Sequence, residues 1–245
     1  MVELKSLKVK IFADGADLQS MKTLYANPVV KGFTTNPTLM KQAGVTNYRD
    51  FAHKVLAAIP DRPVSFEVFA DEFDEMERQA LEIASWGKNV NVKIPVTNTK
   101  REFCGPLVSR LSKRGVQCNV TAVFTLDQVQ RITAALSPDT PAIISVFAGR
   151  IADSGIDPVP LMAEAARIMK SRPKAELLWA SPRELLNVIQ ADQVGCGIIT
   201  VTNDIIKKLA LIGKDQELYS LETVKMFHSD ATAAGFTIDV SAMAK

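Results

Sequence analysis

Short apolar, β-prone runs alternate with longer amphipathic stretches along the whole chain. Many of the short runs are continuously apolar, which is typical of parallel strands covered by helices. The predicted strands are Val9–Ala13, Val30–Thr34, Val64–Phe69, Val90–Ile94, Gln117–Val123, Ala142–Phe147, Glu176–Trp179 and Gly197–Val201. The predicted helices are Ala16–Ala26, Asn47–Ala58, Glu72–Trp86, Lys100–Arg114, Leu126–Ala135, Pro158–Lys170, Pro182–Asp192, Asn203–Ile212 and a C-terminal one near Glu217–Ala234.

This order of elements predicts the fold class. Helix stop signals at Gly87, Gly115 and Ser137–Pro138 agree with the segmentation. No linker, repeat or low-complexity tract divides residues 1–245. We therefore expect one α/β domain, a (β/α)8 TIM barrel with an additional C-terminal helix. An open doubly wound sheet is the alternative, although the glycine-rich phosphate and dinucleotide motifs of such folds are absent.

Composition narrows the class of protein. The 245 residues are 47% hydrophobic and carry a formal net charge of +2, with no basic cluster that would indicate nucleic-acid binding. The three cysteines are widely spaced, and the two histidines stand near no other candidate ligand. No run is long enough to span a membrane, and the first residues lack an apolar signal core. These features predict a cytoplasmic protein with neither metal nor cofactor, and with no nucleic-acid or membrane partner.

Lys93 interrupts the apolar run Val90–Ile94, just before Pro95. In a strand buried on both faces a charged ammonium is costly, so the amine tends to lose its proton and become a nucleophile. Such lysines commonly form Schiff bases with carbonyl compounds. On this stretch alone, the simpler alternative is a side chain that extends from the strand end to solvent.

Each predicted strand carries polar side chains at or near its carboxyl end, where barrel enzymes build their catalytic sites. Singly, each residue has an ordinary explanation: Asp14, Thr35 or Asn36 as helix caps, Glu67 as a strand-end carboxylate, and Arg150 or Arg183 in surface ion pairs. Jointly, they indicate one polar mouth. The residues, in order, are Asp14, Thr34/Thr35/Asn36, Glu67, Lys93, Asn119/Thr121, Ser145/Arg150, Ser181/Arg183 and Thr200/Thr202.

The runs that carry these residues resemble the transaldolase family, and in particular its short subfamily, which also contains the fructose-6-phosphate aldolases. The resemblance spans nearly the whole chain, and its motifs fall in order on seven consecutive strands. They are Phe12–Asp17, Thr34–Thr38, Val64–Val68, Val92–Thr97, Cys118–Phe124, Ile144–Asp153 and Ala180–Arg183.

The resemblance implies a transferase of the pentose phosphate pathway that moves a dihydroxyacetone unit from a ketose phosphate to an aldose phosphate. The donors would be sedoheptulose 7-phosphate or fructose 6-phosphate, and the acceptors glyceraldehyde 3-phosphate or erythrose 4-phosphate. It gives Lys93 the Schiff base, Asp14 the acid/base role, and Glu67 a water relay beside Thr121. It also implies a sugar-binding set and an anion-binding set: Thr34, Asn36, Asn119, Ser145 and Phe147, and Arg150, Ser181 and Arg183.

Several positions separate the two activities within the resembling family. The aldolases carry Gln where this chain has Glu67 and Tyr where it has Phe147, and they lack Asn119 and Ser145. Pro182 departs from the usual Phe, and Val146 from the proline of longer transaldolases. The first departure leaves open a sulfonated ketose as substrate.

Other classes of function make different predictions. A Schiff-base lyase would release free dihydroxyacetone, and a deoxyribose-phosphate type of lysine aldolase would not need the Thr34–Thr38 run. A sugar-phosphate sensor or scaffold would bind ligand without a reducible imine. The resemblance also implies a homo-oligomer, such as a pentamer or decamer, in which residues 217–245 could reach a neighbour.

Overall fold

The computed structural model describes residues 3–239, which fall into two compact units. One unit is Leu7–Leu209, and the other gathers the described parts of Met1–Ser6 and Ala210–Lys245. The assignment of the whole chain to one domain stays a prediction.

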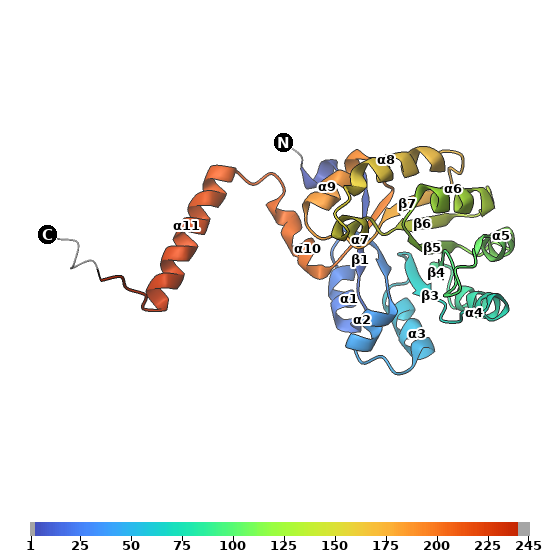
Figure 1. Cartoon of the computed structure of the whole chain (residues 1–245). Helices are drawn as coiled ribbons and strands as arrows, with labels where there is room; N and C mark the ends of the chain where they lie inside the picture. Colours follow the sequence, from blue (N-terminus) through green and yellow to red (C-terminus); the bar gives the residue numbers. More distant parts are fainter. Residues whose placement is uncertain (1–2, 240–245) are drawn as a thin grey trace. The chain divides into compact units, whose positions relative to one another are not determined.

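The unit Leu7–Leu209 is built on a closed barrel of eight strands in chain order (Figure 1). Every strand runs parallel to its neighbours, and β8 pairs with β1 to close the ring. The predicted (β/α)8 barrel is therefore confirmed. The strands are β1 (Lys10–Asp14), β2 (Val30–Thr34), β3 (Val64–Glu67), β4 (Val90–Pro95), β5 (Cys118–Val123), β6 (Ala142–Val146), β7 (Ala175–Trp179) and β8 (Ile198–Val201).

Helices follow the strands and cover the outside of the barrel (Figure 1). They are α1 (Leu18–Tyr25), α2 (Pro37–Gln42), α3 (Tyr48–Ala58), α4 (Phe73–Ser85), α5 (Gly105–Lys113), α6 (Leu126–Ala135), α7 (Ala148–Asp153), α8 (Pro158–Met169), α9 (Leu186–Gln193) and α10 (Asn203–Lys208), followed by a 3-10 turn, η2 (Leu209–Leu211).

Two of these helices were not predicted, and two begin four or five residues later than expected. Helices α2 and α7 have six residues each, which is too short for an apolar repeat to be visible. Helix α5 begins at Gly105 instead of Lys100, with Pro106 in its first turn, where proline is favoured. Helix α9 begins at Leu186 instead of Pro182, and the Arg183 and Glu184 amides that precede it donate to the side-chain oxygen of Asn187.

The strands are buried on both faces, which explains their continuous apolar runs. All five residues of β6 and all four of β8 are buried. A cluster of Phe12, Ile143, Leu178, Ala180 and Ile198 forms part of the core, and Phe147 packs against it. The closed barrel thus forms a rigid scaffold, and the polar side chains lie at the carboxyl ends of its strands.

The second unit contains a short 3-10 turn, η1 (Leu4–Ser6), and the helix α11 (Gln216–Ala233). The predicted C-terminal helix is confirmed. The side chain of Asp215 caps α11 by accepting a hydrogen bond from the Leu218 amide. None of its residues is buried, and apolar side chains such as Val224 and Phe227 are exposed. Within residues 3–239, no helix has the length and hydropathy of a membrane span.

Candidate active site

Every residue to which the resemblance gives a role lines one cavity of about 570 Å³, as do Thr200 and Thr202. Of the residues predicted at the polar mouth, Thr35 lies outside this lining. The cavity lies at the carboxyl ends of the strands, and all eight strands or the segments just after them supply its polar side chains. The predicted residues that line it are Asp14, Thr34, Asn36, Glu67, Lys93, Asn119, Thr121, Ser145, Phe147, Arg150, Ser181 and Arg183. Their individual roles stay predictions.

Lys93 lies in β4 and is only 7% exposed, so its amine does not extend to bulk solvent. The strand register pairs Lys93 with Glu67 on β3 and with Asn119 on β5. Its Nζ donates a hydrogen bond to the main-chain oxygen of Thr35 at 2.8 Å and lies 3.2 Å from Glu67 Oε2. The amine is thus held between two acceptors, at the floor of a polar cavity.

Asp14 ends β1 and faces the same cavity. Its Oδ1 accepts a hydrogen bond from Thr34 Oγ1 at 2.7 Å, and its Oδ2 accepts one from Asn36 Nδ2 at 3.2 Å. Burial raises the pKa of the Asp14 carboxyl, against the opposing effects of these hydrogen bonds and of the charge on Lys93. A carboxyl with a raised pKa is suited to exchange protons near neutral pH.

The explanation as a helix cap is wrong for Asp14 and correct for Asn36. Asp17, not Asp14, caps α1, because its side chain accepts from the Ser20 amide. Asn36 does cap α2: its Oδ1 accepts from the Leu39 amide, while its Nδ2 reaches Asp14. The cap therefore fixes the orientation of Asn36 toward the cavity.

Buried hydroxyl and amide groups on β3, β5 and β6 form a hydrogen-bonded row. Ser145 Oγ donates to Asn119 Oδ1 at 2.6 Å, and Asn119 Nδ2 donates to Ser65 Oγ at 3.1 Å. Thr121, also buried, lies on β5 in register with Pro95. These groups offer fixed polar partners to a polyhydroxylated ligand.

Two arginines reach the cavity, Arg150 from helix α7 after β6 and Arg183 from the loop after β7. The guanidinium of Arg150 lies 5.4 Å from the centre of the Phe147 ring, which in turn stacks on Phe124. Arg183 makes an ion pair with Asp153, and its Nε lies 2.9 Å from Asp153 Oδ1. The explanation of Arg183 as a surface ion pair is thus correct, although the same residue lines the cavity.

The ion pair shifts the pKa of both partners. A hydrogen bond from Arg183, and then the charges of Arg183 and Arg150, lower the pKa of Asp153. The same hydrogen bond raises the pKa of Arg183. The predicted anion-binding region therefore contains two guanidinium groups and one carboxylate.

The loop that carries Ser181 is packed tightly against α7. A Cβ added to Gly149 would lie 1.5 Å from the Ser181 main-chain oxygen, so only glycine fits there. The Gly149 amide also donates to the Ala180 oxygen at 3.3 Å. This close approach places Arg150 and Arg183 on adjoining segments.

Thr200, which was predicted at the polar mouth, has its hydroxyl 2.6 Å from Thr34 Oγ1 and extends the chain of hydroxyls from Asp14. Three other contributions were not predicted from the sequence. Tyr48 holds the main chain of Glu67. The Thr35 carbonyl holds Lys93, and Asp153 holds Arg183. For Asp153 the signal was present in the Ile144–Asp153 run, whereas the other two depend on contacts between distant segments.

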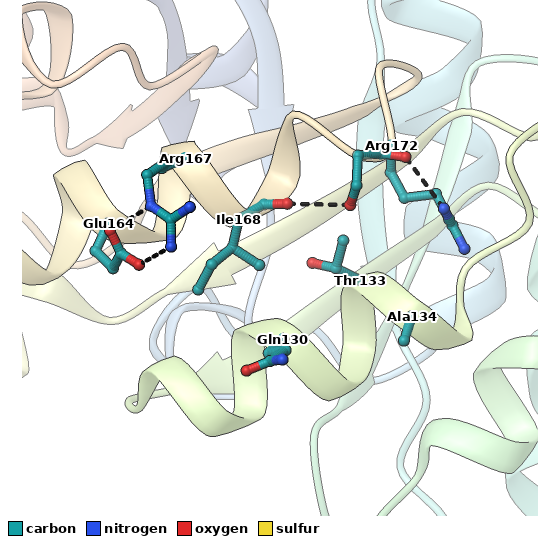
Figure 2. Close-up of a pocket in the computed structure, with 8 residues that line it drawn as sticks. Gln130, Thr133, Ala134, Glu164, Arg167, Ile168 and Arg172 are labelled. Atoms are coloured by element: carbon teal, nitrogen blue, oxygen red, sulfur yellow. Dashed lines mark hydrogen bonds and ion pairs between the residues drawn. The ribbon is translucent and has the colours of Figure 1, made fainter.

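A second hollow, of about 540 Å³, lies between α6 and α8 (Figure 2). Its arginines are already engaged: Arg167 pairs with Glu164, and Arg172 donates to the main-chain oxygen of Leu136. It contains none of the predicted residues. Among residues 3–239, no three histidine, cysteine or carboxylate side chains are grouped closely enough to hold a metal ion.

Comparison with models of protein families shows the family to which this chain belongs. The model of the transaldolase/fructose-6-phosphate aldolase family matches residues 11–245. The chain belongs to this family. Membership supports an enzyme with a transaldolase-type function.

Individual relatives agree with this assignment. A "Probable transaldolase" of Dehalococcoides mccartyi is 36% identical over 202 residues, which cover 82% of this chain and 90% of the relative. Proteins of the same name from Methanococcus maripaludis and Streptococcus agalactiae are 34% and 37% identical, over 82% and 79% of this chain and 89% and 86% of their own lengths.

Among solved structures, a "putative phosphonomutase" of Burkholderia cenocepacia superposes with a TM-score of 0.58. The alignment covers 93% of this chain and 96% of the other, at 10% identity. This similarity concerns the fold alone.

Proposed function

We propose that this protein is a transaldolase that carries a dihydroxyacetone unit on Lys93 as a Schiff base. The donor would be fructose 6-phosphate or sedoheptulose 7-phosphate, and the acceptor erythrose 4-phosphate or glyceraldehyde 3-phosphate. One observation carries the proposal: the amine of Lys93 is buried at the cavity floor, 3.2 Å from Glu67, with Asp14 on the same rim.

The first stage forms the imine. The Lys93 amine, once deprotonated, attacks C2 of the ketose, and the resulting carbinolamine loses water to give an iminium. Glu67 lies close enough to exchange protons with the amine and, through a water held by Thr121, with the departing hydroxyl. The iminium then withdraws electrons from C3, as a metal ion would in a metal-dependent aldolase.

The second stage breaks the C3–C4 bond. Asp14 takes the proton of the C4 hydroxyl, the electron pair of the C3–C4 bond moves toward the iminium, and the aldehyde leaves. The raised pKa of Asp14 favours this exchange, because the carboxyl must accept a proton in one half-reaction and return it in the other. What remains on Lys93 is a three-carbon enamine.

The third stage retains that enamine until an acceptor aldehyde arrives. Asn36, Asn119 and Ser145 supply hydrogen-bond partners around the cavity for the dihydroxyacetone hydroxyls. Their geometry is fixed by Asp14, Ser65 and each other, so holding the fragment costs little further ordering. Retention distinguishes a transferase from a lyase.

The anion of the substrate would bind at the outer rim. Arg150, Ser181 and Arg183 line that side of the cavity. Guanidinium groups recognise phosphate oxygens in a planar, bidentate way. A sulfonated ketose would use the same groups, and Pro182 beside Arg183 is the position at which such a preference would be set.

A steady-state assay separates transfer from cleavage. The protein is mixed with fructose 6-phosphate, with and without erythrose 4-phosphate, and both sedoheptulose 7-phosphate and free dihydroxyacetone are measured. We expect sedoheptulose 7-phosphate to form only with acceptor, and little dihydroxyacetone in either case. Rapid release of dihydroxyacetone without acceptor would identify a fructose-6-phosphate aldolase type of lyase instead. A parallel arm with a sulfonated ketose tests the alternative substrate.

A further inference from the structure

Tyr48, at the start of α3, contacts the main chain of Glu67 with a single hydroxyl group. The Glu67 amide donates to Tyr48 Oη at 2.6 Å, and Tyr48 Oη lies 3.1 Å from the Glu67 carbonyl oxygen, to which it donates. A phenol can accept and donate at the same time, so both contacts coexist. The Tyr48 side chain therefore pairs with the amide and carbonyl groups of Glu67, as the main chain of a neighbouring strand would.

The hydrogen-bond ladder between β2 and β3 shows what this contact replaces. Phe33 N–H donates to the Pro63 oxygen at 2.8 Å, and Thr35 N–H donates to the Ser65 oxygen at 3.2 Å. In a regular parallel ladder the next bond would run from the Glu67 amide to the Thr35 carbonyl. Instead, the Glu67 amide turns to Tyr48, and the Thr35 carbonyl accepts from Lys93 Nζ at 2.8 Å.

We infer that Tyr48 is a positioning residue, which takes the place of the last β2–β3 ladder bond and so leaves the Thr35 carbonyl free to hold Lys93. The inference rests on the proposed Schiff-base function. One hydroxyl group thereby orients two members of the site: Glu67 through its own main chain, and Lys93 through the carbonyl that Glu67 does not occupy.

Packing holds the tyrosine ring in place for this task. Its centroid lies 4.7 Å from that of Phe69, 5.5 Å from Trp86 and 6.1 Å from Phe66. Burial raises the pKa of the Tyr48 hydroxyl, so the group stays protonated and can donate. A phenylalanine would keep these ring contacts and remove only the hydroxyl group.

The test compares Tyr48→Phe with a matched control, Tyr25→Phe. Tyr25 also loses one hydrogen bond in this change, to Asp61 on the exposed surface. Each protein is mixed with fructose 6-phosphate, and the rate of borohydride-trapped adduct at Lys93 is followed by mass spectrometry. We expect about tenfold slower trapping in Tyr48→Phe, with the KM of the acceptor unchanged. Tyr25→Phe should match the wild type.

A double variant tests whether Tyr48 acts through Glu67. If it does, adding Tyr48→Phe to Glu67→Gln should slow trapping by clearly less than the tenfold effect of Tyr48→Phe alone, because only the route through Thr35 and Lys93 remains. Losses that multiply, or trapping in Tyr48→Phe as fast as in Tyr25→Phe, would overturn the inference. A wild-type protein that forms no adduct at all would instead remove the proposed function.

Hydrogen exchange of backbone amides tests the contact between Tyr48 and Glu67 without an activity assay. Because the measurement is made on the wild-type protein, it remains available if Tyr48→Phe does not fold. We expect the Glu67 amide to be protected in the wild type to a similar degree as the Val68 amide, which donates to the Lys93 oxygen at 3.1 Å. A Glu67 amide in the wild type that exchanges like an exposed loop would overturn the inference.

Discussion

The tight packing of Gly149 against the Ser181 loop makes Gly149→Ala a sharp test of the anion-binding region. The new methyl would lie 1.5 Å from the Ser181 main-chain oxygen and 2.6 Å from its carbonyl carbon. Since ordinary contacts between heavy atoms are about 3.5 Å, the loop must shift by roughly 2 Å. The clash is with main chain, so no side-chain rotation relieves it. Ser181 and Arg183 move with the loop.

A shift of this size should affect binding more than the chemistry at Lys93. A 1 Å misplacement can cost about 100-fold in rate, so we expect kcat/KM for fructose 6-phosphate to fall by about 100-fold. Overpacking should also lower the free energy of unfolding by about 1–3 kcal/mol. The unphosphorylated ketose dihydroxyacetone, which does not use the anion-binding region, should still give a borohydride-trapped adduct at Lys93.

The control is Gly15→Ala, where an added Cβ meets no atom within 4 Å. Gly15 also has no positive φ, so alanine introduces no backbone strain there. Steady-state kinetics and thermal unfolding of both variants decide the matter. A Gly149→Ala protein with kcat/KM within threefold of the control would refute the assigned anion site.

Three further changes test the site. Glu67→Gln should slow transfer more than simple aldol cleavage, and equal losses in the two assays would count against the water relay. Asp14→Asn should lower kcat by about 10²- to 10⁴-fold. Because burial raises the Asp14 pKa, the stability that this group contributes is present at low pH and is lost as the pH rises through the folded-state pKa. The Asn variant should therefore melt above the wild type at pH 8 and not at pH 4; the reverse order would contradict the burial effect. Asp153→Asn removes the carboxylate that competes for Arg183, so the KM for phosphorylated ketoses should fall by up to about fivefold, and a rise would show that Asp153 orients Arg183 instead.

The barrel could be predicted because its strands are buried on both faces and its longer helices repeat with a helical period. Strand β2 and helix α6 have the predicted bounds, and the other strands agree to within a residue or two. Helix α7 was missed although it carries Arg150, because six residues are too few to display a period. Residues 182–185 were predicted as helix but lie in a loop, where the Arg183 and Glu184 amides donate to the Asn187 side chain, a contact that the hydrophobic pattern does not reveal.

The residues of the candidate site could be predicted from the sequence, but the contacts between their side chains could not. Polar residues at strand ends converge because a closed parallel barrel brings those ends to one rim. The contacts between them depend on side-chain geometry across long separations in the chain. Tyr48 is the clearest case: it lies at the start of a helix, on an aromatic face that reads as ordinary core, and only the structure places its hydroxyl on Glu67.

The central claim is that Lys93 forms a covalent imine with a ketose, and borohydride trapping tests it most directly. Wild type and Lys93→Met are each incubated with fructose 6-phosphate and borohydride, digested, and mapped by mass spectrometry. We predict one reduced dihydroxyacetone or hexose adduct, on Lys93, and none in the variant. An unmodified wild-type protein, or an adduct on another lysine, would contradict the mechanism.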